Sequence, residues 1–291
     1  MPPVAKDSRP RSLDVLAAGP WDDRELAAIR HAVDPSIDWP TLPSLAAACD
    51  RIEATDDPPE LILLAQPRPG AVNSHDVERL RSLAPLTRLI VVAGSWCEGE
   101  LRSGQPLPGV IRLYWHELPA WWRVALARRT AGECPPWSGP LDDLRAGQLI
   151  REGEAPAEPF ATTEPRGQVV IDALDYHAFD ALAAALATDG WQATWQPRRC
   201  TVVWSSDGSA GAIAVGIWDG GQLNDGELAA LTQFCSRCAE NLAPVLVLLD
   251  YPRHEHLEMI RNAGAATLLG KPYQLPLLLD ELNRVRPKAD R

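Results

Sequence analysis

Residues 59–93 read PELILLAQPRPGAVNSHDVERLRSLAPLTRLIVVA, and this stretch decides the fold. Its two ends, 59–65 and 87–93, are short and continuously apolar, which is typical of strands buried on both faces of a sheet. Between them, Val77, Leu80 and Leu83 recur every three residues and form one apolar stripe on a helix at 76–83. The stretch therefore predicts a strand–helix–strand unit of a parallel sheet.

The same alternation continues on both sides of this unit. Further strands are predicted at 13–17, near 37–39 and at 110–115, and further helices at 22–33, 44–52 and 119–129. Strands that alternate with helices along the chain favour a parallel sheet with helices on both faces. The first half is therefore predicted to be a (βα)₅ domain.

The second half repeats this plan. Its strands are predicted at 169–173, 192–195, 212–217, 245–249 and 266–269, and its helices at 179–187, 225–240, 256–263 and 276–285. Asn73 and Asn224 precede corresponding helices at an offset of 224 − 73 = 151 residues, which indicates an internal duplication. Between 197 and 210 the pattern breaks, because 201–204 is β-prone and a turn follows, so we expect the second helix of the repeat to be short or replaced.

These patterns predict an α/β protein made of two flavodoxin-like, doubly wound (βα)₅ domains. Each domain is expected to hold a five-stranded parallel sheet of order 2-1-3-4-5, the first over residues 12–130 and the second over 167–287. Residues 131–166 are rich in proline and charge and cannot bury much apolar area, so we interpret them as a linker.

Composition excludes several classes of protein. Lys and Arg number 28 against 39 Asp and Glu, a net charge of −11, so we expect no nucleic-acid partner. No apolar run approaches the roughly 18 residues that span a bilayer, and the first residues lack the apolar core of a secretory signal. We therefore expect a cytoplasmic protein that does not associate with membranes and keeps its six cysteines as thiols.

The most specific motif is AGAATLLGKPY at residues 263–273. It resembles the end of the receiver domain of response regulators, the CheY-like superfamily, in which a Gly-Ala pair leads into the fifth strand and a Lys-Pro pair ends it. The resemblance extends over about 167–286, with 243–247 as the fourth strand. It implies a pocket in which an aspartate accepts a phosphoryl group from a histidine kinase with the help of Mg²⁺.

Three positions of that pocket have candidates near the motif. By the resemblance, Lys271 matches the phosphate-binding lysine, Pro272 the proline that follows a cis bond, and Tyr273 the aromatic residue after it. Asp219 is the candidate phosphoacceptor at the end of the third strand. Counting back from 225 instead places Trp218 at that position, so both alternatives stay open.

The remaining pocket positions depart from the family. Leu174 and Asp175 align with the acidic pair, so a leucine replaces one carboxylate, and Asp172 lies earlier in the strand. Leu249 aligns with the hydroxyl residue, and Asp250 beside it is polar but negatively charged. If Mg²⁺ binds at all, Asp175 and Asp219 are its expected ligands, because Mg²⁺ prefers carboxylate oxygens.

The first half lies further from the family pattern and is interpreted as the more decayed copy. No carboxylate cluster remains at its pocket positions. They are occupied by Ala18 and Gly19 for the acidic pair, Ala65 and Gln66 for the acceptor, Ala93 for the hydroxyl, and His116 and Glu117 for Lys-Pro.

Together these features indicate a regulatory or scaffolding protein of the two-component type that is not an enzyme and needs no cofactor. Its pseudo-receiver domains would bind a partner protein, such as a histidine kinase, or form a dimer, with Tyr273, Trp121 and Trp122 as partner surface. Two alternatives remain: a phosphoryl-accepting response regulator that uses Asp219 with Mg²⁺, and a Rossmann-like small-ligand binder or enzyme.

Overall fold

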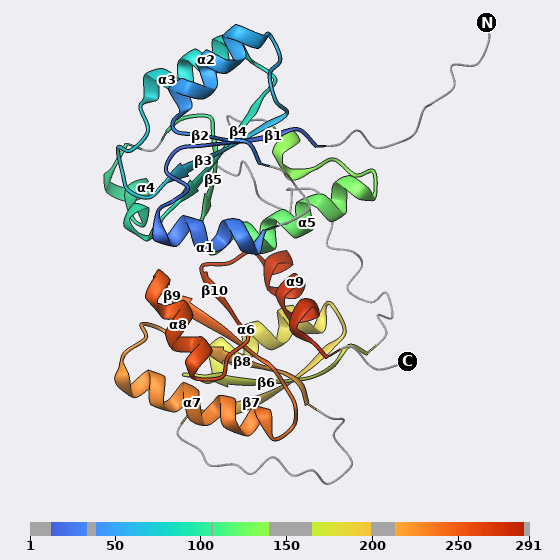
Figure 1. The fold of residues 1–291 in the computed structure, drawn as a ribbon. Helices are drawn as coiled ribbons and strands as arrows, with labels where there is room; N and C mark the ends of the chain where they lie inside the picture. The colour runs from blue at the N-terminus through green and yellow to red at the C-terminus, as the bar shows by residue number, and fades with distance from the viewer. Residues whose placement is uncertain (1–12, 34–38, 106, 140–164, 199–212, 288–291) are drawn as a thin grey trace, which may run out of the picture. The chain divides into compact units, whose positions relative to one another are not determined.

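The computed structural model describes residues 13–33, 39–105, 107–139, 165–198 and 213–287. It contains two five-stranded sheets, and the chain divides into two compact units, one built on each sheet (Figure 1). Residues 116–124 group with the second unit. Residues 199–212, where we expect the second helix of the repeat to be short or replaced, lie outside the described residues.

The first sheet has the predicted order, β2-β1-β3-β4-β5, with all strands parallel. Its central pair is the one predicted from the apolar runs, because Leu61 is in register with Arg88 and Gln66 with Ala93. The strands are β1 (Val15–Ala18), β2 (Thr41–Leu42), β3 (Leu61–Gln66), β4 (Arg88–Ala93) and β5 (Ile111–Tyr114).

Helices cover both faces of this sheet. α2 and α3 pack side by side on one face over buried residues of β1, β3 and β4, and α1 lies on the other (Figure 1). The side chains of Asp23, Ser44 and Asn73 cap α1, α2 and α3 by accepting hydrogen bonds from free backbone N–H groups. The helices are α1 (Arg24–Ala32), α2 (Leu45–Thr55), α3 (Ser74–Leu83), α4 (Glu100–Ser103) and α5 (Leu118–Thr130), with 3₁₀ turns at Ser95–Cys97 and Pro136–Ser138.

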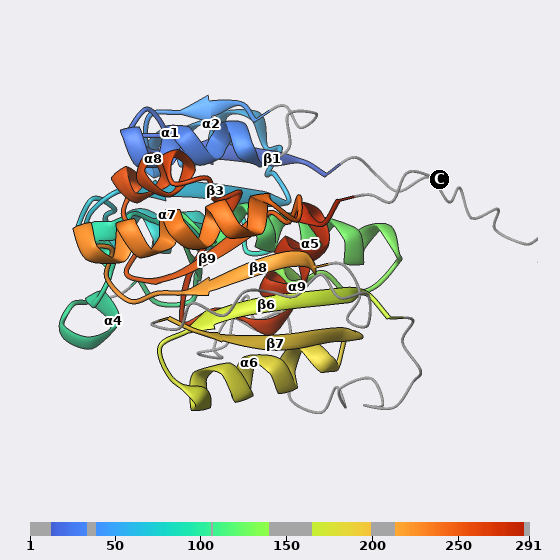
Figure 2. The same ribbon diagram turned by 90° about the horizontal axis from the view of Figure 1, so that it is seen from below.

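The second sheet has the same order, β7-β6-β8-β9-β10, and is also parallel (Figure 2). This confirms the predicted flavodoxin-like fold class for both sheets. Its strands are β6 (Gly167–Ala173), β7 (Trp191–Pro197), β8 (Ile213–Asp219), β9 (Val245–Asp250) and β10 (Thr267–Lys271).

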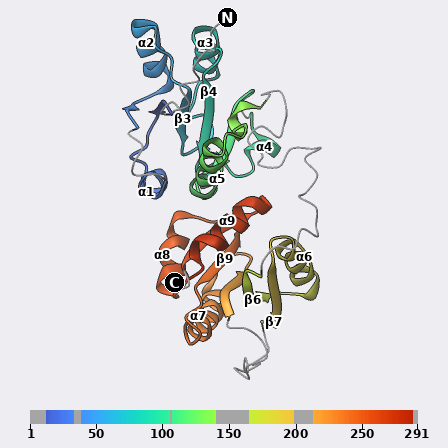
Figure 3. The ribbon, with the colours of Figure 1, turned by 90° about the vertical axis from the view of Figure 1, so that its right-hand side faces the viewer.

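The helices of the second unit follow from the direction of each crossover. The connection from β6 to β7 runs one way across the sheet and that from β8 to β9 runs the other, so right-handed crossovers place α6 and α7 on opposite faces (Figure 3). The helices are α6 (Tyr176–Ala187), α7 (Asp225–Ala239), α8 (His254–Asn262) and α9 (Leu275–Val285).

Most of the strand predicted near 37–39 lies outside the described residues, and the second strand of the sheet, β2, begins at Thr41. Trp39 precedes it, and its buried ring packs edge-on against Trp21 at 5.9 Å between centroids. Thr41 and Leu42 pair with Ala17 and Ala18.

The predicted linker begins in ordered structure. Trp137 is only 2% exposed, and its Nε1 donates a hydrogen bond to Glu60 Oε1 at 3.3 Å. The residues just after α5 therefore pack on the first unit, and residues 140–164 lie outside the described part. The exact domain boundaries and the internal duplication stay predictions.

A search of the described residues finds no helix that is long and apolar enough to cross a membrane.

Candidate functional site

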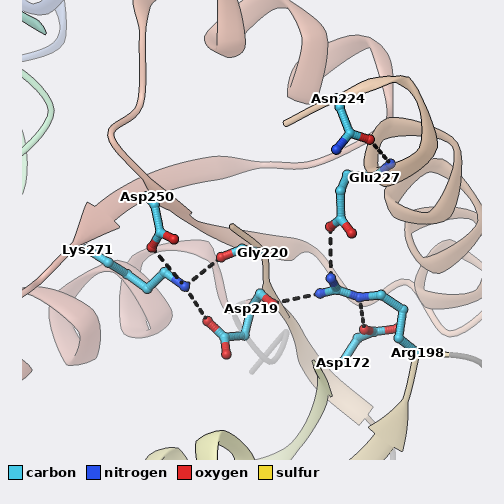
Figure 4. A network of polar contacts seen from close by, with 8 residues as sticks. All are labelled: Asp172, Arg198, Asp219, Gly220, Asn224, Glu227, Asp250 and Lys271. Carbon is cyan, nitrogen blue, oxygen red and sulfur yellow. Dashed lines mark hydrogen bonds and ion pairs between the residues drawn. The ribbon is translucent and has the colours of Figure 1, made fainter. Parts of the chain in front are cut away.

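The candidate site lies at the carboxyl edge of the second sheet, where strand ends bring charged side chains together (Figure 4). β6, β8, β9 and β10 end in or beside Asp172, Asp219, Asp250 and Lys271. Doubly wound folds bind their ligands at this edge, because the carboxyl ends of all parallel strands meet there.

Lys271 is the centre of a first polar group. Its Nζ lies 3.0 Å from Asp219 Oδ1 and 3.2 Å from Asp250 Oδ1, and it donates a hydrogen bond to the carbonyl oxygen of Gly220 at 2.5 Å (Figure 4). The ammonium is thus shared between two carboxylates. The Lys271–Pro272 bond is cis, as the resemblance implies.

Arg198, directly after β7, is the centre of a second group. Its Nε donates to Asp172 Oδ1 at 3.0 Å, its Nη1 to Glu227 Oε2 at 2.8 Å and its Nη2 to the carbonyl oxygen of Asp219 at 2.6 Å. Its guanidinium also lies 4.0 Å from the ring centroid of Trp218, a cation–π contact. The Arg198 side chain is only 10% exposed, so these contacts hold it inside the edge of the sheet.

Strand alternation explains which side chain of β8 faces Lys271. Asp172 is in register with Trp218 and Ala173 with Asp219, and neighbouring residues of one strand point to opposite faces. Trp218 packs against Phe234 of α7 at 5.8 Å between ring centroids. The side chain on the Lys271 side of β8 is therefore that of Asp219, and the side chain of Trp218 points to the opposite face.

Burial raises the pKa values of two side chains at this edge. Asp172 is 1% exposed, and burial raises the pKa of its carboxyl although the Arg198 guanidinium opposes the shift. Its Oδ2 is buried and makes no hydrogen bond within the described residues. Burial, with the nearby Asp219 charge, also raises the pKa of the half-buried Tyr273 to about 12.

Two predicted pocket residues lie elsewhere. Asp175 stands two residues beyond the end of β6, where its exposed carboxylate caps α6 by accepting from the Ala178 N–H at 2.9 Å. Asp175 therefore caps α6, and its role as a ligand if Mg²⁺ binds stays a prediction. Leu174 is 62% exposed.

Other predicted residues are buried. Leu249 is 1% exposed within β9, and its side chain has no polar atom to offer the edge. Trp121 and Trp122 are both fully buried, and the structure gives no support to their predicted role as partner surface.

The resemblance implies Mg²⁺, but the residues present do not fit it. Among the described residues, no three His, Cys, Asp or Glu side chains are placed to hold a metal ion. Asp172 is paired with a guanidinium and Asp219 with an ammonium, so both carboxylates already have a cation.

Sequence reasoning missed Arg198 and Glu227. Arg198 comes directly after an edge strand, and Glu227 lies in the first turn of α7, so nothing in their local spacing links them to Asp172. The one available signal was the pair Arg198 and Arg199 at a strand end, where the fold places its ligand-binding residues.

The carboxyl edge of the first sheet is also filled by its own side chains. Arg112 of β5 forms an ion pair with the buried Glu100, and its Nη1 lies within 3.4 Å of Gln66 Oε1. Gln66 also donates to Glu100 at 3.4 Å. Gln66 stands at the predicted acceptor position, so an internal arginine–carboxylate pair occupies this edge too.

Comparisons with known proteins bear on the fold. No family model matches the chain, and no curated protein matches it. Among solved structures, it is similar to a pilus assembly-related protein of Burkholderia pseudomallei, with 24% identity over 40% of this chain and 87% of that one at a TM-score of 0.35.

Two further similar structures are receiver proteins. A response regulator from Thermotoga maritima is 19% identical over 41% of this chain and 96% of its own, with a TM-score of 0.32. The Vibrio cholerae chemotaxis protein CheY4 is 18% identical over 41% of this chain and 98% of its own, with a TM-score of 0.35. These similarities concern the fold alone.

Proposed function

We propose that this chain is a cytoplasmic regulatory protein of the two-component type that acts by binding a partner protein and not as an enzyme. In this proposal its second unit is a pseudo-receiver, which keeps the receiver fold and does not accept a phosphoryl group. The likeness to response regulators supports the signalling class, and the pocket geometry supports the loss of phosphoryl transfer.

The observation that carries the proposal is the sharing of Lys271 between Asp219 and Asp250. A phosphoryl group on Asp219 would carry about two negative charges in place of the single charge of its carboxylate, beside the carboxylate of Asp250. Like charges this close repel strongly, and the single ammonium of Lys271 cannot neutralise both. Leu249 adds no hydrogen-bond donor for a phosphoryl oxygen.

The partner surface would include Tyr273, which lies next to Lys271 at the start of the segment leading into α9. Its side chain is half-buried and lies within the electrostatic influence of Asp219, so a partner that contacts Tyr273 would be affected by the charge of Asp219. This position links the pocket to the surface of the unit.

The experiment is an intact-mass measurement after incubation with acetyl phosphate and Mg²⁺. The expected result is no phosphoryl adduct on the wild-type protein. The matched control is Asp219→Asn, which removes the candidate acceptor and keeps the size of the side chain. An adduct on the wild type that is missing from Asp219→Asn would contradict the proposal and favour an active receiver.

A further inference from the structure

Three oxygens accept hydrogen bonds from the Arg198 guanidinium. One comes from the carboxylate of Asp172 on β6, one from the carboxylate of Glu227 on α7 and one from the main chain of Asp219 on β8 (Figure 4). Two carboxylates and a carbonyl are hard oxygen donors of the kind that divalent cations bind. In this chain the same set surrounds a guanidinium.

We propose that Arg198 is the resident cation of this edge and takes the place of a divalent metal ion. The inference rests on the proposed function and specifies why the edge would not bind Mg²⁺. It predicts that the wild-type edge does not bind Mg²⁺, because the Arg198 guanidinium already occupies the space that these oxygens surround. It also predicts that removing the guanidinium uncovers a site that accepts Mg²⁺.

An independent observation supports a cation site at Asp172. The second oxygen of this 1%-exposed carboxylate, Oδ2, is buried without a hydrogen-bond partner in the described residues. A buried oxygen of this kind costs free energy unless a donor or cation faces it. Arg198 satisfies only Oδ1, and Arg237 also acts on this carboxylate through its charge, so Oδ2 can still accept a further positive ligand once the Arg198 guanidinium is gone.

The first sheet shows the same arrangement built from other elements. There Arg112 lies on β5, which is the edge strand at the other end of the strand order from the one that Arg198 follows in the second sheet. Arg112 pairs with Glu100 and contacts Gln66 at the end of β3. Two edges therefore each carry an internal arginine paired with a buried carboxylate. This is expected if both units hold one state without a bound ion.

The test is the melting temperature of Arg198→Met with and without Mg²⁺, at constant ionic strength set with NaCl. Methionine keeps much of the apolar stem of arginine and removes the charge. We expect Mg²⁺ at about ten times its dissociation constant to raise the melting temperature of this variant by about 5 °C and to leave the wild type unchanged. Arg261→Met, which removes an exposed arginine of α8, should behave as the wild type.

The double variant Arg198→Met with Asp172→Asn should lose the response to Mg²⁺, because it removes the carboxylate on which the site depends. A Mg²⁺ response that persists in the double variant, or a folded Arg198→Met protein without one, would overturn the inference. If Arg198→Met does not fold, the inference is tested by adding Mn²⁺ to the wild-type protein and recording its amide NMR signals. Paramagnetic broadening of amide signals at 172 and 219 would overturn the inference, and no broadening there would support it.

These outcomes are separable from those of the proposed function. Wild-type protein that binds Mg²⁺ and forms no phosphoryl adduct would refute the role of Arg198 and leave the proposed function standing. An adduct on Asp219 that forms equally well without Mg²⁺ would refute the proposed function and leave the role of Arg198 standing.

Discussion

Each nitrogen of the Arg198 guanidinium donates to a different residue, and its face lies on an aromatic ring. This arrangement ties the ends of β6 and β8 to the start of α7 through one side chain. Arginine is suited to it because its fork of donors is planar and rigid, whereas lysine offers one point charge. At the level of residues, the edge is held by geometry as much as by charge.

Glu227→Gln tests this geometry. The change keeps the shape of the side chain and removes one of the two carboxylates that face Arg198. Since hydrogen bonds to charged groups contribute about 1.5–3 kcal/mol and Glu227 is partly exposed, we expect a loss of about 1–2 kcal/mol in the free energy of unfolding, measured with urea. Glu255→Gln, at a carboxylate that is 60% exposed, is the control, and equal losses in the two variants would count against the role of Glu227.

The cysteines give a second prediction at this scale. Burial raises the pKa of Cys97 to about 11 and those of Cys235 and Cys238 to about 12, whereas Cys134 is exposed. Only the thiolate reacts with alkylating reagents, so at neutral pH Cys134 should be modified before Cys97, Cys235 and Cys238, which should be protected. Peptide mapping after brief alkylation of the native protein checks this, and early modification of Cys235 or Cys238 would show that α7 is packed differently.

At the scale of elements, continuous apolar runs were enough to locate the buried strands. Runs such as 61–65 and 245–249 have no competing interpretation, because they are too short for helices and too apolar for loops. The short edge strand β2 was not predicted, because two residues carry no periodicity. The site was predicted only in part, because Lys271 belongs to a local motif while Arg198 meets Asp172 only after the strands are assembled.

Gly216→Ala tests the packing of β8 against α7. A Cβ at this position would lie 2.6 Å from Cys238 Sγ and 3.1 Å from Phe234 Cε1, so the helix or the strand must shift. Overpacking of this kind costs roughly 1–3 kcal/mol, and we expect a loss within that range in urea unfolding. The control is Gly221→Ala, where the nearest atom would be 3.6 Å away, and a loss in that variant as large as in Gly216→Ala would contradict the packing described.

At the scale of the whole molecule, the chain carries two sheets of the same order joined by a segment rich in proline and charge. Limited proteolysis should cut first between Thr130 and Gly167 and leave two stable fragments, because such a segment offers little burial. The burial of Trp137 makes cuts between 130 and 139 less favourable, because such a cut would have to release its ring and its hydrogen bond to Glu60. We therefore expect the first cuts after residue 139, located by fragment mass. First cuts inside either sheet would show that the domain boundaries are wrong.

In this proposal Arg198 and Lys271 already occupy the carboxylates at the edge of the second sheet, and the edge responds to neither Mg²⁺ nor a phosphoryl donor. The most direct measurement is a titration of the wild-type protein with Mg²⁺, followed by acetyl phosphate, monitored by the amide NMR signals of residues 172–175 and 219–221. We expect no saturable shift of these signals at either step. A saturable Mg²⁺-dependent shift there, with a second set of signals after acetyl phosphate, would show that the edge still binds Mg²⁺ and accepts a phosphoryl group.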